Sequence, residues 1–136
     1  MKLLIDTHIF LWAYGAPEKL TDDALSLLEN ESIEKYISAA SAWEIAIKWA
    51  TGAIELPEYP VTLIPAKVAE AGIHNLPISM QDALRVSELP MYHHDPFDRI
   101  LVAQAQRNHA TILTNDKVFA KYDVEVIALW LNDEDE

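Results

Sequence analysis

The chain has 136 residues, enough for one domain with a buried core. Hydrophobic residues make up 51% and charged residues 24%, which excludes an intrinsically disordered or fibrous protein, and no apolar run is long enough to span a membrane. Without cysteine there is neither a disulfide framework nor a thiolate metal site, which fits a cytoplasmic protein. The formal net charge of −12 argues against a passive nucleic-acid binder that works by counterion release.

Apolar runs of strand length alternate with helical stretches along the chain. The expected strands are residues 2–5, 36–38, 111–114 and 124–127, with a further short one at 76–78 that Pro77 weakens. The expected helices are residues 9–14, 21–30, 41–51, 60–71, 79–89 and 95–108. This alternation predicts an α/β fold with a central, mostly parallel sheet of four or five strands, covered by helices on both faces. We expect one domain over residues 1–131 and a solvated acidic tail over 132–136.

Four acidic residues fall at junctions of these predicted elements. Asp6 follows the first strand and Asp116 follows the strand at 111–114. Glu44 and Asp98 lie near the starts of two predicted helices. In a right-handed parallel α/β sheet, the carboxyl ends of strands and the starts of the following helices share one edge, where ligands bind. The four carboxylates can therefore be close in space although they are far apart in sequence.

Three of these acids also have a simple structural interpretation in the helix or turn that they begin. Asp6 could be the N-cap of the next helix, and Asp116 could be a cap or a turn residue. Asp98 lies in a first helical turn, where a carboxylate complements the helix dipole, after the favourable N-cap Asp95 and Pro96. Capping needs one acid, however, and this segment has two within four residues.

The helix that contains Glu44 gives a second structural alternative. Ser41 and Glu44 match a capping box, and Glu44 precedes Lys48 by four residues, a favourable helical pair. The rest of this helix is apolar nearly all round, so its polar residues form one narrow stripe. A mostly buried helix with one polar stripe is expected to present that stripe to a polar group.

A cluster of these carboxylates would require a compensating positive charge. Two carboxylates about 4 Å apart repel by about 4 kcal/mol at an effective dielectric constant near 20, so four need a cation or a shared proton. Oxygen ligands without cysteine favour Mg²⁺ or Mn²⁺. His93 and His94 could also be metal ligands, but adjacent histidines point in different directions, and His8 is more simply a packing or capping residue.

Taken together, these segments resemble the PIN domain, specifically the VapC-type toxin ribonucleases. The resemblance covers about residues 1–131 and rests on four blocks in the family's order: Leu4-Ile5-Asp6-Thr7-His8 with Leu11-Trp12, Ser41-Ala42-Trp43-Glu44-Ile45-Ala46-Ile47-Lys48, Asp95-Pro96-Phe97-Asp98-Arg99 with Ala103-Gln104-Ala105, and Thr114-Asn115-Asp116 with Phe119. It implies that Asp6, Glu44, Asp98 and Asp116 form the catalytic, metal-binding site, with Asp6 and Asp98 as its principal ligands. Thr7 and Thr114 match hydroxyl positions beside that site.

The resemblance also implies an activity and partners. It implies Mg²⁺- or Mn²⁺-dependent endonucleolytic hydrolysis of RNA, in which the cation bridges the acidic residues and the anionic phosphate of the substrate. Lys48 and Arg99 are expected to steer the RNA backbone or to pair with the acids. The implied protein partners are a cognate antitoxin, whose basic tail would block the acidic groove, and a second copy of the chain in a homodimer.

Three other functions remain open at this point. A response-regulator receiver domain is also α/β with an acidic Mg²⁺ pocket, but it requires adjacent acids after the first strand, where this chain has only Asp6. A PIN-like fold that has lost activity would act only as a binding module. A nuclease that cleaves DNA or matures RNA would use the same chemistry on another substrate, and surface shape, which the sequence does not define, determines which RNA is cleaved.

Overall fold

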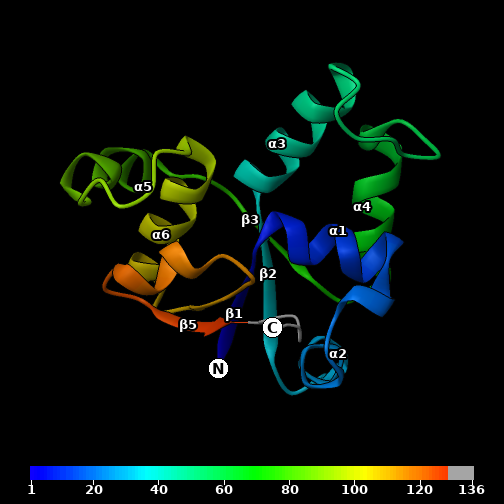
Figure 1. The fold of residues 1–136 in the computed structure, drawn as a ribbon, viewed down its shortest axis with the longest axis horizontal. Coiled ribbons are helices and arrows are strands. Elements are labelled where there is room, and N and C mark those ends of the chain that lie inside the picture. Colours follow the sequence, from blue (N-terminus) through cyan, green and yellow to red (C-terminus); the bar gives the residue numbers. More distant parts are fainter. Residues whose placement is uncertain (129–136) are drawn as a thin grey trace.

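A parallel sheet of five strands forms the centre of the molecule in the computed structural model, which describes residues 1–128 (Figure 1). The strands are β1 (Lys2–Ile5), β2 (Glu34–Ser38), β3 (His74–Leu76), β4 (Thr111–Thr114) and β5 (Glu125–Ala128). Their order is β3-β2-β1-β4-β5, and every neighbouring pair is parallel. Leu4 of the central strand lies opposite Tyr36 on one side and Ile112 on the other. The predicted α/β architecture is confirmed, with five strands.

Helices connect successive strands. They are α1 (Thr7–Gly15), α2 (Asp22–Glu29), α3 (Ala39–Ala50), α4 (Pro60–Glu70), α5 (Met80–Arg85) and α6 (Pro96–Asn108), with short 3₁₀ helices η1 (Pro17–Lys19), η2 (Val86–Glu88) and η3 (Lys117–Lys121). Among residues 1–128, no helix combines the length and the apolar composition needed to cross a membrane. The predicted tail at 132–136 and the predicted domain end at 131 lie outside the described residues.

Helices cover both faces of the sheet, as predicted. Successive side chains of β1 point to opposite faces. Leu3 and Ile5 belong to a core that residues of α1, α2, α3 and α4 complete, whereas Leu4 packs into a second core with α6 and η3. Figure 1 accordingly shows α5 and α6 on one side of the strands and α1, α2 and α4 on the other. The two apolar layers fix the positions of the loops at the carboxyl edge of the sheet.

Helix α3 differs from its prediction at its start and in its burial. Ser38 is the N-cap, and its Oγ accepts a hydrogen bond from the Ala40 N–H at 2.9 Å, so the predicted capping box of Ser41 and Glu44 is wrong. The burial differs from the prediction as well: Trp43 is 61% exposed, whereas Glu44 is 4% exposed. Figure 1 shows α3 extending away from the sheet, so only the face toward the body of the molecule is covered. That covered face carries the polar Ser41 and Glu44 beside the apolar Ala40 and Ile45.

The strand expected at 76–78 lies two residues earlier. β3 ends at Leu76 and pairs with β2, so that His74 lies opposite Tyr36. Pro77 has no backbone N–H to donate and cannot extend this edge strand. The helix expected over 79–89 also divides into α5 and the short η2, and Ser79 and Asp82 form a reciprocal capping box at its start.

Candidate active site

The carboxyl edges of β1 and β4 bring two predicted site residues into direct contact. Asp6 follows β1, and Thr114 is the last residue of the adjacent β4. The Thr114 hydroxyl donates to Asp6 Oδ2 at 2.5 Å, and its oxygen accepts the backbone N–H of Asp116 at 3.0 Å. One buried hydroxyl therefore joins the acid after β1 to the loop after β4. This position, beside the central strand where the strand order reverses, is where parallel α/β sheets bind ligands.

Asp6 and Asp116 are helix caps and members of the acidic cluster at the same time. Oδ1 of Asp6 accepts from the His8 N–H at 3.4 Å at the start of α1, and Oδ1 of Asp116 accepts from the Val118 N–H at 2.9 Å at the start of η3. In both residues the other oxygen, Oδ2, is directed elsewhere, toward Thr114 and His93 respectively. Capping and a role in the cluster are thus compatible, because they use different oxygens of one carboxylate.

Glu44 is a buried carboxylate with only one satisfied oxygen. Its Oε2 accepts from Lys48 Nζ at 2.8 Å, a hydrogen bond that raises the pKa of Lys48. Its Oε1 is buried and has no hydrogen-bond partner among residues 1–128. Beside it, the Thr7 hydroxyl donates to Ser41 Oγ at 2.7 Å and joins α1 to α3. Buried carboxylate oxygens are rarely left without a partner, so Glu44 has the capacity to bind a ligand here.

Asp98 is part of the cluster and is not the helix cap. Asp95 is the N-cap of α6, accepting from the Phe97 N–H at 2.9 Å. Burial, together with the charges of Asp6, Asp95, Glu44 and Asp116, raises the pKa of Asp98 to about 8. Burial also raises the pKa of Asp6, although its hydrogen bond with Thr114 opposes that effect. The structure therefore places all four predicted acids within electrostatic reach of one another.

His93 is a site residue whose role the sequence did not determine. Its Nε2 lies 2.9 Å from Oδ2 of Asp98 and 2.9 Å from Oδ2 of Asp116, and these three side chains could hold a metal ion. His94, in contrast, is exposed. The sequence signal for His93 was its position two residues before the helix cap Asp95.

The structure pairs Arg99 with backbone carbonyls instead of with the acids. Its guanidinium is buried and donates to the backbone carbonyls of Val86 and Pro90 at 2.9 Å, with longer bonds to Leu89 and His93. The carbonyls of residues 86–93 thus occupy the donors of the guanidinium, and among residues 1–128 it forms no ion pair with the acids. Lys48, by contrast, pairs with an acid as predicted.

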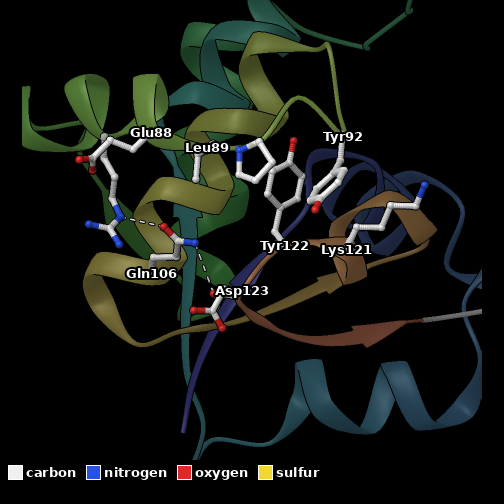
Figure 2. Close-up of a pocket in the computed structure, with 9 residues that line it drawn as sticks. Glu88, Leu89, Tyr92, Gln106, Lys121, Tyr122 and Asp123 are labelled. Atoms are coloured by element: carbon white, nitrogen blue, oxygen red, sulfur yellow. Dashed lines mark hydrogen bonds between the residues drawn. The ribbon is translucent and has the colours of Figure 1, made fainter.

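A hollow of about 300 Å³ lies next to the acidic cluster and is separate from it (Figure 2). Figure 2 shows Tyr92 and Tyr122 on its wall and a hydrogen-bonded series from Arg85 through Gln106 to Asp123. The residues that line this hollow, among those that the structure describes, do not include any of the four acids. The hollow is thus a surface feature distinct from the acidic cluster at the edge of the sheet.

The donor set at that edge suits a hard divalent cation. Carboxylate oxygens are the ligands that Mg²⁺ and Mn²⁺ prefer. A cation would also satisfy the unpartnered Oε1 of Glu44 and would favour the ionised form of Asp98, whose pKa burial and the neighbouring acids raise. The residues present therefore fit such an ion.

Solved structures of bacterial toxin–antitoxin complexes contain chains with this fold. A chain from VapBC2 of Rickettsia felis, bound to a DNA fragment from the promoter, matches with a TM-score of 0.72 at 15% identity, covering 95% of this chain and 99% of that one. DNA-bound VapBC from Salmonella typhimurium matches with a TM-score of 0.66 at 14% identity over 94% and 98% of the two chains. A toxin–antitoxin complex from Klebsiella pneumoniae matches with a TM-score of 0.61 at 20% identity over 93% and 96%.

The family assignment follows from the sequence match together with this geometry. None of the curated protein sequences matches the chain. The family model of the PIN domain, however, matches residues 3–125, which include most of β1, all of β4 and all four acids. The chain belongs to the PIN domain family.

Proposed function

We propose that this protein is a divalent-cation-dependent endoribonuclease that acts as the toxin of a toxin–antitoxin pair. PIN domains are generally nucleases, and the observation that carries the proposal is the convergence of four carboxylates on one edge of the sheet. Within this cluster, Glu44 Oε1 is buried without a partner and the pKa of Asp98 is raised to about 8. Such a cluster requires a proton or a cation to be stable, and a phosphodiesterase site uses the cation.

Each residue of the cluster has a distinct part in this proposal. Asp6, Glu44, Asp98 and Asp116 would hold Mg²⁺ or Mn²⁺, which, when bound, supplies the positive charge that draws and polarises an RNA phosphate. The Thr114 hydroxyl fixes the orientation of Asp6, and the hydrogen bond between Thr7 and Ser41 holds α3, with Glu44, against α1. Lys48 neutralises part of the charge of Glu44 at the rim of the site.

Cleavage of RNA by the purified protein tests this function directly. We expect cleavage with Mg²⁺ or Mn²⁺ that stops when EDTA is added. Asp6→Asn should lower the rate by roughly 10²–10³-fold, because it removes a charge from the centre of the site. Asp23→Asn, which changes an exposed aspartate of α2, is the matched control and should cleave normally. Cleavage that persists in EDTA, or equal rates for the two variants, would contradict the proposal.

A protein partner is the second part of the proposal. The similar chains come from VapBC and other toxin–antitoxin complexes, and the net charge of −12 favours a basic segment at the acidic edge. Expression of the chain alone should stop growth, and co-expression of a neighbouring gene for a small protein with a basic C-terminal segment should restore it. Absence of both effects would favour a nuclease of RNA maturation.

We also propose a homodimer, supported by apolar side chains that the fold leaves exposed. Trp43 and Ile47 on α3, and Met80 and Leu84 on α5, are between 40% and 77% exposed. Exposed apolar residues of this size are typical of protein interfaces. Light scattering after size-exclusion chromatography should give twice the mass of one chain, and a monomeric mass would remove this part of the proposal.

Membership of the PIN family removes the receiver-domain alternative. An inactive PIN-like module is distinguished by the cleavage experiment, because such a module would bind RNA or a partner without hydrolysis.

A further inference from the structure

We propose that His93 is a positioning residue of the acidic site. Its Nε2 donates to both Asp98 and Asp116 and orients their carboxylates toward a common point, and His93 does not itself bind the cation. This inference rests on the proposed function, because it assumes that the carboxylates bind a cation.

The tautomer of His93 follows from its other ring nitrogen. Nδ1 accepts a hydrogen bond from the backbone N–H of Asp95 at 3.2 Å. A ring nitrogen that accepts a hydrogen bond carries no proton, so the proton of the imidazole is on Nε2. Nε2 is therefore a hydrogen-bond donor in this structure, and it has no free lone pair for a metal ion.

That single donor is shared between two carboxylates from different elements. Nε2 is 2.9 Å from Oδ2 of Asp98 in the first turn of α6 and 2.9 Å from Oδ2 of Asp116 at the start of η3. The ligand atoms of His93, Asp98 and Asp116 all lie within 4.8 Å of one another, so the two carboxyl groups repel each other whenever both are ionised. A shared N–H offsets that repulsion without adding a cationic side chain to the site. The oxygens thus converge before a cation is present.

The rest of His93 is held in place independently of the two acids. Its backbone N–H donates to the Tyr122 hydroxyl at 2.8 Å, and its carbonyl accepts a long bond of 3.4 Å from Arg99. Its ring lies 5.8 Å from the ring of Phe119 in a tilted contact. Tyr122, which lines the neighbouring hollow in Figure 2, therefore fixes the backbone of His93 through this hydrogen bond. A donor fixed in this way can impose an orientation on the carboxylates that it contacts.

The alternative is that His93 is itself a metal ligand with Asp98 and Asp116. Histidines that bind a metal almost always donate their second ring N–H to a carbonyl or a carboxylate. His93 has the opposite arrangement, because its second nitrogen faces a backbone N–H donor. The geometry therefore favours a donor to the carboxylates over a ligand to the ion.

Mn²⁺ binding measured without RNA tests the inference. His93→Leu keeps an apolar side chain of similar bulk but removes the donor, and His93→Gln retains an amide N–H at the same number of bonds from the backbone. Loss of a hydrogen-bonding partner behind a metal ligand typically weakens metal binding by about 10–100-fold. We expect that loss in His93→Leu, near-normal affinity in His93→Gln, and no change in His94→Leu, which alters the exposed neighbour.

Electron paramagnetic resonance gives both the affinity, from the signal of free Mn²⁺, and the identity of the ligands. We expect no nitrogen coupling to bound Mn²⁺ in the wild-type protein. A coupling that disappears in His93→Gln would show a histidine ligand and overturn the inference, and this readout remains available if His93→Leu does not fold. Wild-type or tighter affinity in folded His93→Leu would also overturn it. A wild-type protein that binds no Mn²⁺ would instead refute the proposed cation site itself.

Discussion

The carboxyl group of Asp98 lies where ionisation is unfavourable. Its side chain is 15% exposed, and burial together with four neighbouring acids raises its pKa to about 8. In a metal-free protein at neutral pH this group therefore holds a proton. A divalent cation bound in the cluster would displace that proton and lower the pKa of Asp98. The protonation state of Asp98 therefore indicates whether a cation is bound.

The stability of the metal-free protein should decrease as the pH rises. The folded protein keeps the Asp98 proton up to about pH 8, whereas the unfolded chain releases it near 3.8. Between these values the folded state binds more protons, so the free energy of unfolding falls with rising pH. Urea denaturation in EDTA between pH 5 and 8 should show this slope, and Asp98→Asn should flatten it. Equal slopes in both proteins would assign the dependence to other groups.

Lys48 should matter most when no cation is present. Lys48→Met leaves a buried oxygen of Glu44 unpaired, which should lower the free energy of unfolding by about 1–3 kcal/mol in EDTA. Mg²⁺ should restore much of the loss by binding the cluster. Lys48→Arg keeps the charge and is the matched control. Urea denaturation of the three proteins measures the effect, and a Lys48→Met variant as stable as wild type would contradict it.

The positions of three acids could be predicted from the sequence because Asp6 and Asp116 lie just after strands and Asp98 lies in the first turn of α6. Asp6 and Asp116 needed only the end of an apolar run, and the parallel sheet brings such ends together. His93 and Arg99 could not be assigned in the same way. Asp116, the partner of His93 at the N-cap of η3, is 23 residues away in sequence. The partners of Arg99 are backbone carbonyls, which no side-chain pattern reveals.

At the scale of elements, the accurate predictions had local signals. β1, β4 and the start of α6 were located by apolar runs that end at polar residues and by Asp95 followed by Pro96. The start of α3 was wrong because Ser41 and Glu44 imitate a capping box inside a helix that Ser38 begins. Its burial was wrong because hydrophobicity does not show how far a helix extends beyond the sheet.

Arg99 holds the segment before α6, and replacing it should destabilise the fold irrespective of metal. A lysine ammonium cannot reproduce the planar fork that reaches carbonyls of residues 86–93. Arg99→Lys should therefore lower the free energy of unfolding by roughly 2–4 kcal/mol, because buried acceptors lose their donors. Urea denaturation should give the same loss in EDTA and in Mg²⁺. A loss that Mg²⁺ removes would instead place Arg99 in the acidic site.

The whole molecule combines a large negative charge with a fold that gathers acids at one edge. A net charge of −12 repels RNA at long range, so an RNA-cleaving chain of this composition requires a cation at the point of contact. The sheet provides that point, because the carboxyl ends of the adjacent parallel strands β1 and β4 lie at one edge. The central claim is thus that the four acids form a cation site and are more than helix caps.

Thermal unfolding of wild type and Asp98→Asn at pH 8, each in EDTA and in Mg²⁺ or Mn²⁺, tests that claim most directly. In EDTA the variant should be as stable as wild type or more so, because it relieves repulsion within the cluster. The metal should raise the Tm of wild type and raise that of the variant much less. A variant that melts lower in EDTA, by the roughly 0.3–1 kcal/mol of a lost helix-dipole interaction, and that responds normally to metal would contradict it.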